Sequence, residues 1–268
     1  MSNRKKNYVT ARQIDGRSGI QTPHERELES IGKNKLKIFT AMPPETIKTF
    51  IETRLNGKIE NIEFGEQYTV SFEYFPAVNI HILYFNYEAE ESEPMGGPEL
   101  KFLFSGERVM WVPSEDLNSF IDVALEYLED LTDSKTEPYN IAKDKTSLLK
   151  NAITQRTEPF LTLEPAHLND LATFIGGQVE QTSTGWALSK PFFPGIEIHL
   201  LYNYNTRNLD IQYSGVHVQN INHYARDLLS IFLINHCLRF ISITYPTIQM
   251  PRIIKQVFSY SYLKSHSQ

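Results

Sequence analysis

Two strand patterns recur along this chain with the same order of apolar and polar residues. The sequence FPAVNIHILY spans residues 75–84 and FPGIEIHLLY spans residues 193–202, and six of the ten positions are identical. Because alternate residues of a strand point to opposite faces, Ile80 and Ile82 are expected on one face and His81 on the other. Recurrence of the pattern 118 residues apart predicts two copies of one unit.

A helix is predicted upstream of each strand pattern, over residues 42–57 and 163–177. Apolar residues recur there three or four positions apart, which is the spacing of one helix face. Proline stands near the start of each segment and glycine at its end, as is typical of helix termini. The residues that set this pattern are Pro44, Ile47, Phe50, Ile51, Leu55 and Gly57 in the first copy, and Pro165, Leu168, Leu171, Phe174, Ile175 and Gly177 in the second.

The repeat also continues downstream of the strand patterns. ELKFLFSGERVMWV (99–112) and NLDIQYSGVHVQNI (208–221) share a Ser-Gly pair, and each leads into a long helix. The first of these helices is predicted to begin at Ser114. The second is far more apolar and is therefore expected to be buried on more than one side.

Together these patterns predict an α+β fold built from two tandem repeats. With leading strands at 36–42 and 159–164, each repeat reads strand, helix, four strands, helix. Such units favour one curved antiparallel sheet with the helices on its convex face. The predicted boundaries are a disordered basic tail at 1–34, the first repeat at 35–131, a linker at 132–158 with a short helix at 147–153, the second repeat at 159–245 and a C-terminal tail at 246–268.

Charge is divided unevenly along the chain, whose net charge is −6. Residues 1–35 carry +4, residues 36–150 carry −11 and residues 151–268 carry +1. An acidic first repeat repels phosphates, so binding of a nucleic acid would have to overcome that charge. The single cysteine, Cys237, and the absence of an apolar run of about 18 residues predict an intracellular protein, nuclear or cytoplasmic, without a membrane span.

Candidate chemistry is sparse, and no arrangement of acid, base and nucleophile can be assembled from the sequence. His81 and His199 recur, but repeated histidines without nearby carboxylates are more typical of packing than of a metal site. Cys237 follows His236 on a helix, where neighbouring side chains point about 100° apart, which favours a buried inert thiol. We therefore predict a non-enzymatic protein with no cofactor, no metal and no small-molecule substrate.

The duplicated unit resembles the saddle of the TATA-box-binding protein family. The resemblance covers roughly residues 36–130 and 159–243, and it rests on the FP-opened strand, the strand ending in Ser-Gly and the long helix that follows. In that family the concave sheet binds the minor groove of DNA, and phenylalanines wedge between base pairs.

Carried over position by position, the resemblance implies a set of DNA-contacting residues. Phe75 and Phe193 match the wedges that open the FP strands. The second wedge of each repeat falls on Leu103 and Gln212, or on Phe104 and Tyr213 if the register slips by one residue, which would turn these side chains to the opposite face. A threonine that touches bases becomes Trp111 or Asn220.

Two functions follow from the sequence. The preferred one is a TATA-binding-protein-like protein that acts in transcription and contacts double-stranded DNA through its concave sheet. The alternative is a protein-interaction scaffold on the same saddle, because the family's paired asparagines and the lysine after Ser-Gly have no counterpart here. Protein partners are expected under both hypotheses.

Overall fold

The chain divides into two compact units, each of which is described by itself. The computed structural model describes residues 7–17, 21–87, 96–132, 138–140, 146–247 and 256–266. Unit 1 comprises Met1–Ser134 together with Ser259–Gln268, and unit 2 comprises Lys135–Phe258. Both units combine helices with an antiparallel sheet, so the predicted α+β class is confirmed.

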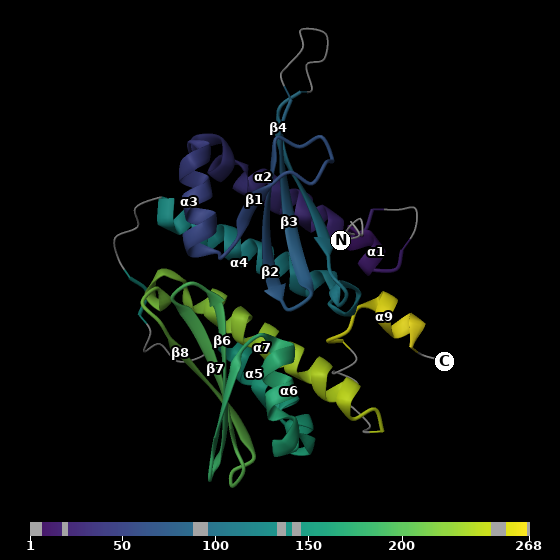
Figure 1. Cartoon of the computed structure of the whole chain (residues 1–268), viewed down its shortest axis with the longest axis vertical. Helices are drawn as coiled ribbons and strands as arrows, with labels where there is room; N and C mark the ends of the chain where they lie inside the picture. Colours follow the sequence, from purple (N-terminus) through teal and green to yellow (C-terminus); the bar gives the residue numbers. More distant parts are fainter. Residues whose placement is uncertain are drawn as a thin grey trace, which may run out of the picture. The chain divides into compact units, whose positions relative to one another are not determined.

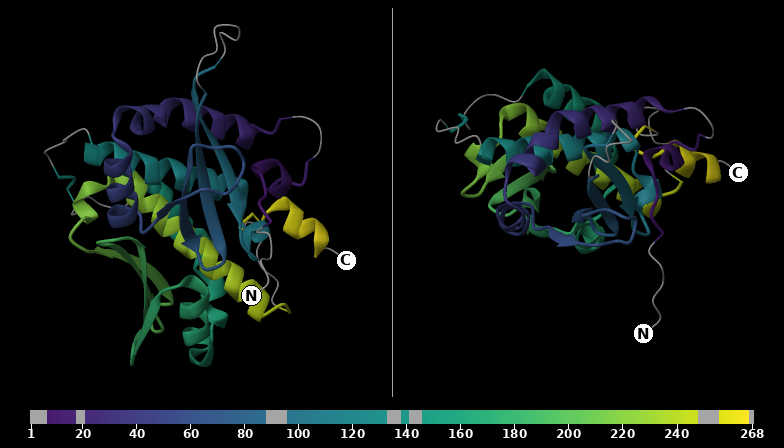
Figure 2. Two further views of the ribbon diagram at one scale, coloured as in Figure 1. Left: turned by 45° about the horizontal axis from the view of Figure 1, so that its top comes forward. Right: turned by 90° about the horizontal axis from the view of Figure 1, so that it is seen from above.

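Unit 1 contains a four-stranded antiparallel sheet in the order β1-β2-β3-β4. Its strands are β1 (Lys58–Glu60), β2 (Tyr68–Phe75), β3 (Val78–Asn86) and β4 (Pro98–Ser105), and its helices are α1 (Ala11–Ile14), α2 (Pro23–Ala41), α3 (Pro44–Arg54), η1 (Val109–Trp111), α4 (Ser114–Thr132) and α9 (Tyr260–Ser265). Figures 1 and 2 show α2 and α4 on one side of this sheet. Apolar residues of that face, such as Ile80, Ile82 and Phe104, form the core of the unit.

Unit 2 repeats this arrangement with the strand order β5-β6-β7-β8. Its strands are β5 (Gln178–Thr182), β6 (Gly185–Phe193), β7 (Ile196–Asn203) and β8 (Asn208–Ser214), and its helices are α5 (Ser147–Arg156), η2 (Glu158–Thr162), η3 (Pro165–His167), α6 (Leu168–Ile175), η4 (Val218–Asn220) and α7 (His223–Thr244). Helices α6 and α7 lie on one side of the sheet (Figures 1 and 2). Most residues of α7 are buried, as its apolar sequence predicted.

The two units match in detail at the Ser-Gly pair. Gly106 and Gly215 have φ angles of 118° and 112°, which favour glycine. A Cβ atom at either position would lie 2.1 or 2.2 Å from a backbone carbonyl oxygen, that of Ala77 or Gly195. The shared glycine therefore lets the end of β4 or β8 approach the turn of the neighbouring hairpin.

The two predicted leading strands are wrong. Residues 36–41 form the end of helix α2, and residues 159–162 belong to the 3-10 helix η2. The reason is that the helical spacing of apolar residues becomes visible only over a segment longer than 36–42. Ile38 and Phe39 continue the buried stripe that begins with Leu28 and Ile31. In the second segment Phe160 and Leu163 are buried at a spacing of three.

The predicted single curved sheet is also wrong. The described strands form two separate four-stranded sheets, and no strand joins them. Without the leading strands, each sheet ends at β1 or β5 on one side and at β4 or β8 on the other. The helices still cover one face of each sheet, but a continuous concave surface is not formed by strand pairing.

The N-terminal segment is structured where it was predicted to be disordered. Residues 7–17 and 21–34 contain α1 and most of α2, and residues 1–6 and 18–20 lie outside the described residues. Thr10 and Thr22 each form a capping box with the residue three positions later, Gln13 and Glu25. These two boxes are visible in the sequence as T-x-x-Q and T-x-x-E and indicate helix starts.

The predicted linker and C-terminal tail also contain helices. Helix α5 confirms the short helix expected at 147–153. Helix α9 packs in unit 1, where the Ser259 N–H donates to the Trp111 carbonyl at 2.9 Å and the Tyr262 and Trp111 rings lie 5.8 Å apart. One described helix, α7, is long and apolar enough to span a membrane, although 78% of its most apolar window is buried, as in the core helices of many folded proteins.

Candidate functional site: two histidine relays and an edge groove

A relay of three polar side chains crosses the sheet of unit 1. His81 of β3 is joined through Nδ1 to the Ser71 hydroxyl of β2 at 2.7 Å, and through Nε2 to the Ser105 hydroxyl at the end of β4 at 2.8 Å. All three residues lie on the sheet face opposite the helices, because their register partners alternate with the core residues. All three are nevertheless buried.

Unit 2 contains the same relay at the equivalent positions. His199 of β7 is joined to the Ser189 hydroxyl through Nδ1 and to the Ser214 hydroxyl through Nε2, both at 2.7 Å. Glu197 replaces Asn79 of unit 1, and its Oε2 lies 3.4 Å from the Ser214 hydroxyl and 3.8 Å from His199 Nε2. This relay is accessible, since Ser214 is exposed and the His199 side chain is 24% exposed.

The N-terminal segment covers the relay only in unit 1. The Tyr8 ring packs edge-on against His81, with ring centroids 5.0 Å apart, and against Phe64 at 5.4 Å. Val9 exchanges two backbone hydrogen bonds with Phe104 on the outer edge of β4, at 2.8 and 2.9 Å. The Tyr8 side chain therefore covers His81 on the sheet face opposite the helices.

The β1–β2 connection, residues 61–67, also belongs to unit 1 alone. Glu66 accepts hydrogen bonds from the N–H groups of Ile62 and Phe64, at 2.5 and 2.8 Å, and from the Thr69 hydroxyl at 3.0 Å. Burial by itself raises the pKa of Glu66, but these donors outweigh it and hold the pKa below its usual value. In unit 2 only two residues, 183 and 184, connect β5 to β6.

The relays are explained best as cross-strand links. In a catalytic triad the serine and the carboxylate lie on opposite ring nitrogens. Here each ring nitrogen faces a serine, and Glu197 lies on the same side of His199 as Ser214, 3.8 Å from Nε2. Burial of the copy that contains His81 leaves no access for a substrate. Among the described residues, no group of three or more histidine, cysteine, aspartate or glutamate side chains could hold a metal ion.

A second polar cluster ties the helices of unit 1 together. His24 Nδ1 lies 3.0 Å from Asp15 and 2.8 Å from the Ser114 hydroxyl, which also donates to Asp15. Both partners meet the same ring nitrogen, so the imidazole cannot pass a proton from the serine to the carboxylate in the manner of a catalytic triad. The cluster instead joins the end of α1 and the start of α2 to the start of α4.

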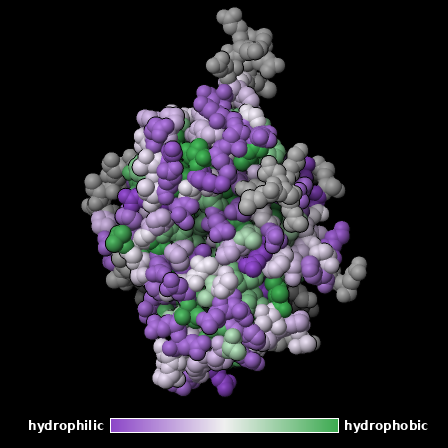
Figure 3. Space-filling model, viewed as in Figure 1, coloured by the Kyte–Doolittle hydropathy of each residue, from purple (hydrophilic) through white to green (hydrophobic). Residues whose placement is uncertain are grey.

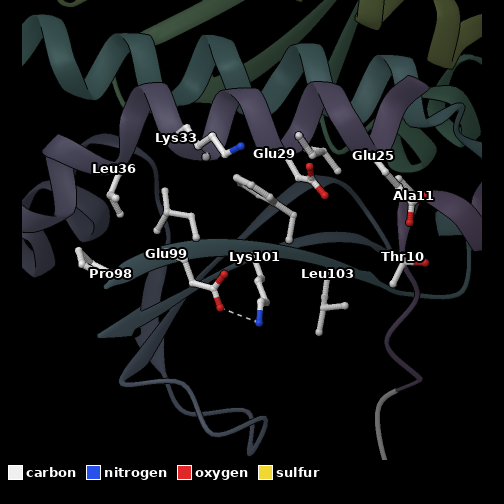
Figure 4. Close-up of a pocket in the computed structure, with 14 residues that line it drawn as sticks. Thr10, Ala11, Glu25, Glu29, Lys33, Leu36, Pro98, Glu99, Lys101 and Leu103 are labelled. Atoms are coloured by element: carbon white, nitrogen blue, oxygen red, sulfur yellow. Dashed lines mark ion pairs between the residues drawn. The ribbon is translucent and has the colours of Figure 1, made fainter. Parts of the chain in front are cut away.

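A groove of about 540 Å³ lies between helix α2 and the outer edge of β4 (Figure 4). Leu28, Gly32 and Leu36 form the helical wall, and Leu100 and Phe102 form the strand wall. Charged side chains lie along the two walls: Glu25, Glu29 and Lys33 on α2, and the ion pair Glu99–Lys101, with 2.7 Å between its atoms, on β4.

Backbone groups of β4 face this groove. In an antiparallel strand, every second residue directs its N–H and C=O to the same side. Since Phe104 pairs outward with Val9, Phe102 and Leu100 must direct theirs outward as well. Within the described part of the chain, no backbone hydrogen bond satisfies these two residues on that side. The groove thus contains a short stretch of strand edge without a backbone partner, against which α2 packs at Gly32, where an added Cβ would lie 3.4 Å from the Leu100 carbonyl oxygen.

The aromatic residues predicted as DNA wedges lie mostly in the cores. Phe75, Phe104 and Phe193 are 0%, 0% and 2% exposed. Tyr213 points to the helical side of its sheet, where its hydroxyl donates to Asp227 at 3.1 Å. Burial raises the pKa of Tyr213 above its usual value. Wedging between base pairs would require these side chains to leave their positions.

The remaining predicted residues lie on four different elements of the two units. Leu103 and Gln212 lie on the relay faces, opposite His81 and His199 in the register. Trp111 belongs to η1 and packs against Tyr262 of α9, with the Arg108 guanidinium 5.9 Å from its ring, and Asn220 ends η4. Sequence reasoning missed Ser71, Ser189 and the groove.

The exposed face of the unit 2 sheet is acidic. By the strand register, Glu180, Glu197 and Asp210 lie on it, and no lysine or arginine does. Elsewhere, Figure 3 shows hydrophobic areas that are small and separated by hydrophilic residues. The acidic face of unit 2 thus disfavours phosphate, and the small apolar areas on the face shown in Figure 3 do not favour a large apolar partner.

No protein-family model, no curated protein and no solved structure matches this chain. The similarity to the TATA-box-binding protein family therefore stays a prediction.

Proposed function

We propose that this chain is a protein-interaction scaffold whose unit 1 binds an extended segment of a partner in the groove between α2 and β4. The observation that carries the proposal is the edge of β4 at Phe102, which has no described backbone partner and borders the groove, whereas α2 already lies against the Leu100 carbonyl at Gly32. An extended peptide can add to such an edge through its main chain, while neighbouring pockets select its side chains.

Val9 supports this mode of binding because it already adds to the same edge. Its two hydrogen bonds to Phe104 are those of one antiparallel pair, after which the chain turns into α1. A partner strand would continue the pairing where Val9 leaves it. The groove extends for roughly 16 Å, the helical rise from Glu25 to Leu36, which is long enough for about five extended residues.

Binding of DNA receives less support from the geometry. The aromatic side chains expected to wedge are buried, the sheets are separate, and the open sheet face of unit 2 carries acidic groups. A saddle of the TATA-binding-protein type would need a continuous concave sheet. We therefore prefer the alternative that the sequence left open.

The test is selection of linear peptides from a display library by the full chain. Peptides that add to an edge lose affinity when alternate residues are N-methylated, since only every second N–H faces the strand. We expect N-methylation to weaken binding at every second residue of the selected peptide. Lys33→Trp should lower the affinity for the peptide about tenfold or more, because the larger side chain fills the groove. Asn34→Trp, at an exposed neighbouring position of α2 outside the groove, is the matched control.

Three results would contradict the proposal. One is failure to select any peptide that Lys33→Trp weakens. Another is N-methylation that weakens binding without a period of two, which would indicate recognition of side chains alone. The third is tight, salt-dependent binding of mixed A·T-rich duplexes, which would favour the DNA hypothesis instead.

A further inference from the structure

The relay of unit 1 is covered by the N-terminal segment, whereas the relay of unit 2 is accessible, and this difference identifies a second candidate site. In unit 1, Tyr8 covers His81 and Val9 completes the strand edge at Phe104. The equivalent residues of unit 2 are His199 and Tyr213, since Ile80 pairs with Phe104 as Ile198 pairs with Tyr213. Among the described residues, no backbone hydrogen bond reaches the outer edge of β8.

We propose that unit 2 binds an extended segment of a partner protein that carries an aromatic residue followed by a β-branched residue, with basic residues nearby. The aromatic ring would pack on His199 as Tyr8 packs on His81. The β-branched residue would exchange backbone hydrogen bonds with Tyr213 as Val9 does with Phe104. This site is separate from the groove of unit 1 and does not depend on it.

Charge indicates why the segment should be basic. Glu197 stands beside the open relay, where unit 1 has the neutral Asn79, and its side chain is 38% exposed. Asp210 lies two residues before Gln212 on the same face of β8. These two acidic side chains lie on the same face of the sheet, so a basic partner is favoured and an acidic one is repelled.

The sequence of the covering segment provides a defined probe. A synthetic peptide of residues 4–13, RKKNYVTARQ, contains the aromatic and β-branched pair with basic residues on both sides. We expect saturable binding to the full chain, detected by fluorescence anisotropy. In NMR spectra, the amides of Gln212, Tyr213 and Ser214 should shift, and the Tyr213 amide should become protected from exchange.

Variants of the peptide and the protein separate the parts of the proposal. Replacing the peptide tyrosine by alanine, or N-methylating its valine, should each weaken binding about tenfold. Glu197→Lys should weaken binding by about tenfold as well. Asp170→Lys, an exposed position of α6 with the same change of charge, should weaken it by less than about twofold, which is the effect of charge at a distance.

Several outcomes would overturn the proposal. One is an equal loss of peptide affinity in Glu197→Lys and Asp170→Lys, and another is peptide binding that does not need the tyrosine. A third is a set of NMR shifts confined to Phe104 and its neighbours, which would mean that the peptide exchanges with the chain's own segment. A dimer of the protein alone that is lost in Glu197→Lys would identify the occupant as a second copy of this chain and would also reject a separate partner.

Discussion

Strands β3 and β7 have nearly the same sequence but differ in how they are buried. In β7 the residues alternate strictly between buried and partly exposed, whereas in β3 every residue from Ile80 to Phe85 is buried. The alternation of β7 is what a sheet with one covered face should show. The difference comes from elsewhere in the chain, because Tyr8 packs on His81 of β3 with Phe64 of the β1–β2 connection against it, and neither residue has a described counterpart over β7.

This comparison shows that a repeated strand can acquire a different role with only a few changes among its own residues. The relay in unit 1 has become part of a buried interior, and the relay in unit 2 is still on the surface. The predictions below test first what the two units share and then how they differ. Since the chain has two units, stability should be measured for each unit by amide hydrogen exchange rather than as one global transition.

The largest effect is expected from the shared glycines. Gly106→Ala and Gly215→Ala should each destabilise their own unit by about 3 kcal/mol or more, because a left-handed φ and an overlap with a backbone carbonyl add together. Equal losses would confirm that the Ser-Gly pairs are equivalent. If the amide hydrogen exchange of one variant equalled that of the wild type, the two units would not be structural repeats at the Ser-Gly pair.

The relay histidines should separate the units. His81→Ala leaves Ser71 and Ser105 buried without their partner, and should cost unit 1 about 3 kcal/mol. His199→Ala leaves serines that water can reach, and should cost unit 2 about 1 kcal/mol. The hydrogen exchange rates of β3 and β7 amides measure both losses of stability. Losses of equal size would contradict the account in which His81 is buried and His199 is accessible.

Removal of the covering ring should have a smaller effect. Tyr8→Ala deletes the edge-on contacts with Phe64 and His81 and should destabilise unit 1 by about 2 kcal/mol. Tyr260→Ala, at a 61% exposed tyrosine of α9, is the control and should cost less than about 0.5 kcal/mol. Unit 2 should be unchanged in both variants, as observed by exchange of β7 amides.

The smallest effect is a dependence on pH that belongs to unit 1. The folded-state pKa of Glu66 lies below its usual value of 4.5, so its contribution to stability is present above pH 4.5 and is lost as the pH falls through the lowered pKa. Glu66→Gln should make the acid-side slope of unit 1 shallower and leave the slope of unit 2 unchanged. An unaltered slope in unit 1 would exclude Glu66 as its source.

Sequence periodicity was sufficient for the elements with local signals. The Ser-Gly ends and the helices that follow were predicted correctly, because turn residues and apolar spacing determine them within about ten residues. The expected opening of each strand by Phe-Pro was wrong, because Phe75 and Phe193 end β2 and β6, and Pro76 and Pro194 lie in the turns that lead to β3 and β7. The segment at 36–42 was misjudged because a short apolar run is compatible with both helix and strand. The buried stripe that decides the question begins earlier, at Leu28.

The candidate sites depended on contacts that sequence does not encode locally. Ser71 and Ser189 each stand ten residues before a relay histidine, a recurrent spacing that could have indicated the pairs. The cover could not have been found in this way, because Tyr8 and His81 are 73 positions apart. The groove likewise requires the register of Val9 against Phe104, which only the folded chain provides.

The most direct test of the central claim is amide exchange at Phe104 and Tyr213, two equivalent positions on the outer edges of β4 and β8. The Phe104 N–H donates to Val9, and no described backbone group accepts from the Tyr213 N–H. We predict strong protection of Phe104, rapid exchange of Tyr213, and loss of the protection at Phe104 when residues 1–9 are deleted. Equal protection of both amides in the full chain would contradict the account of one covered and one open unit.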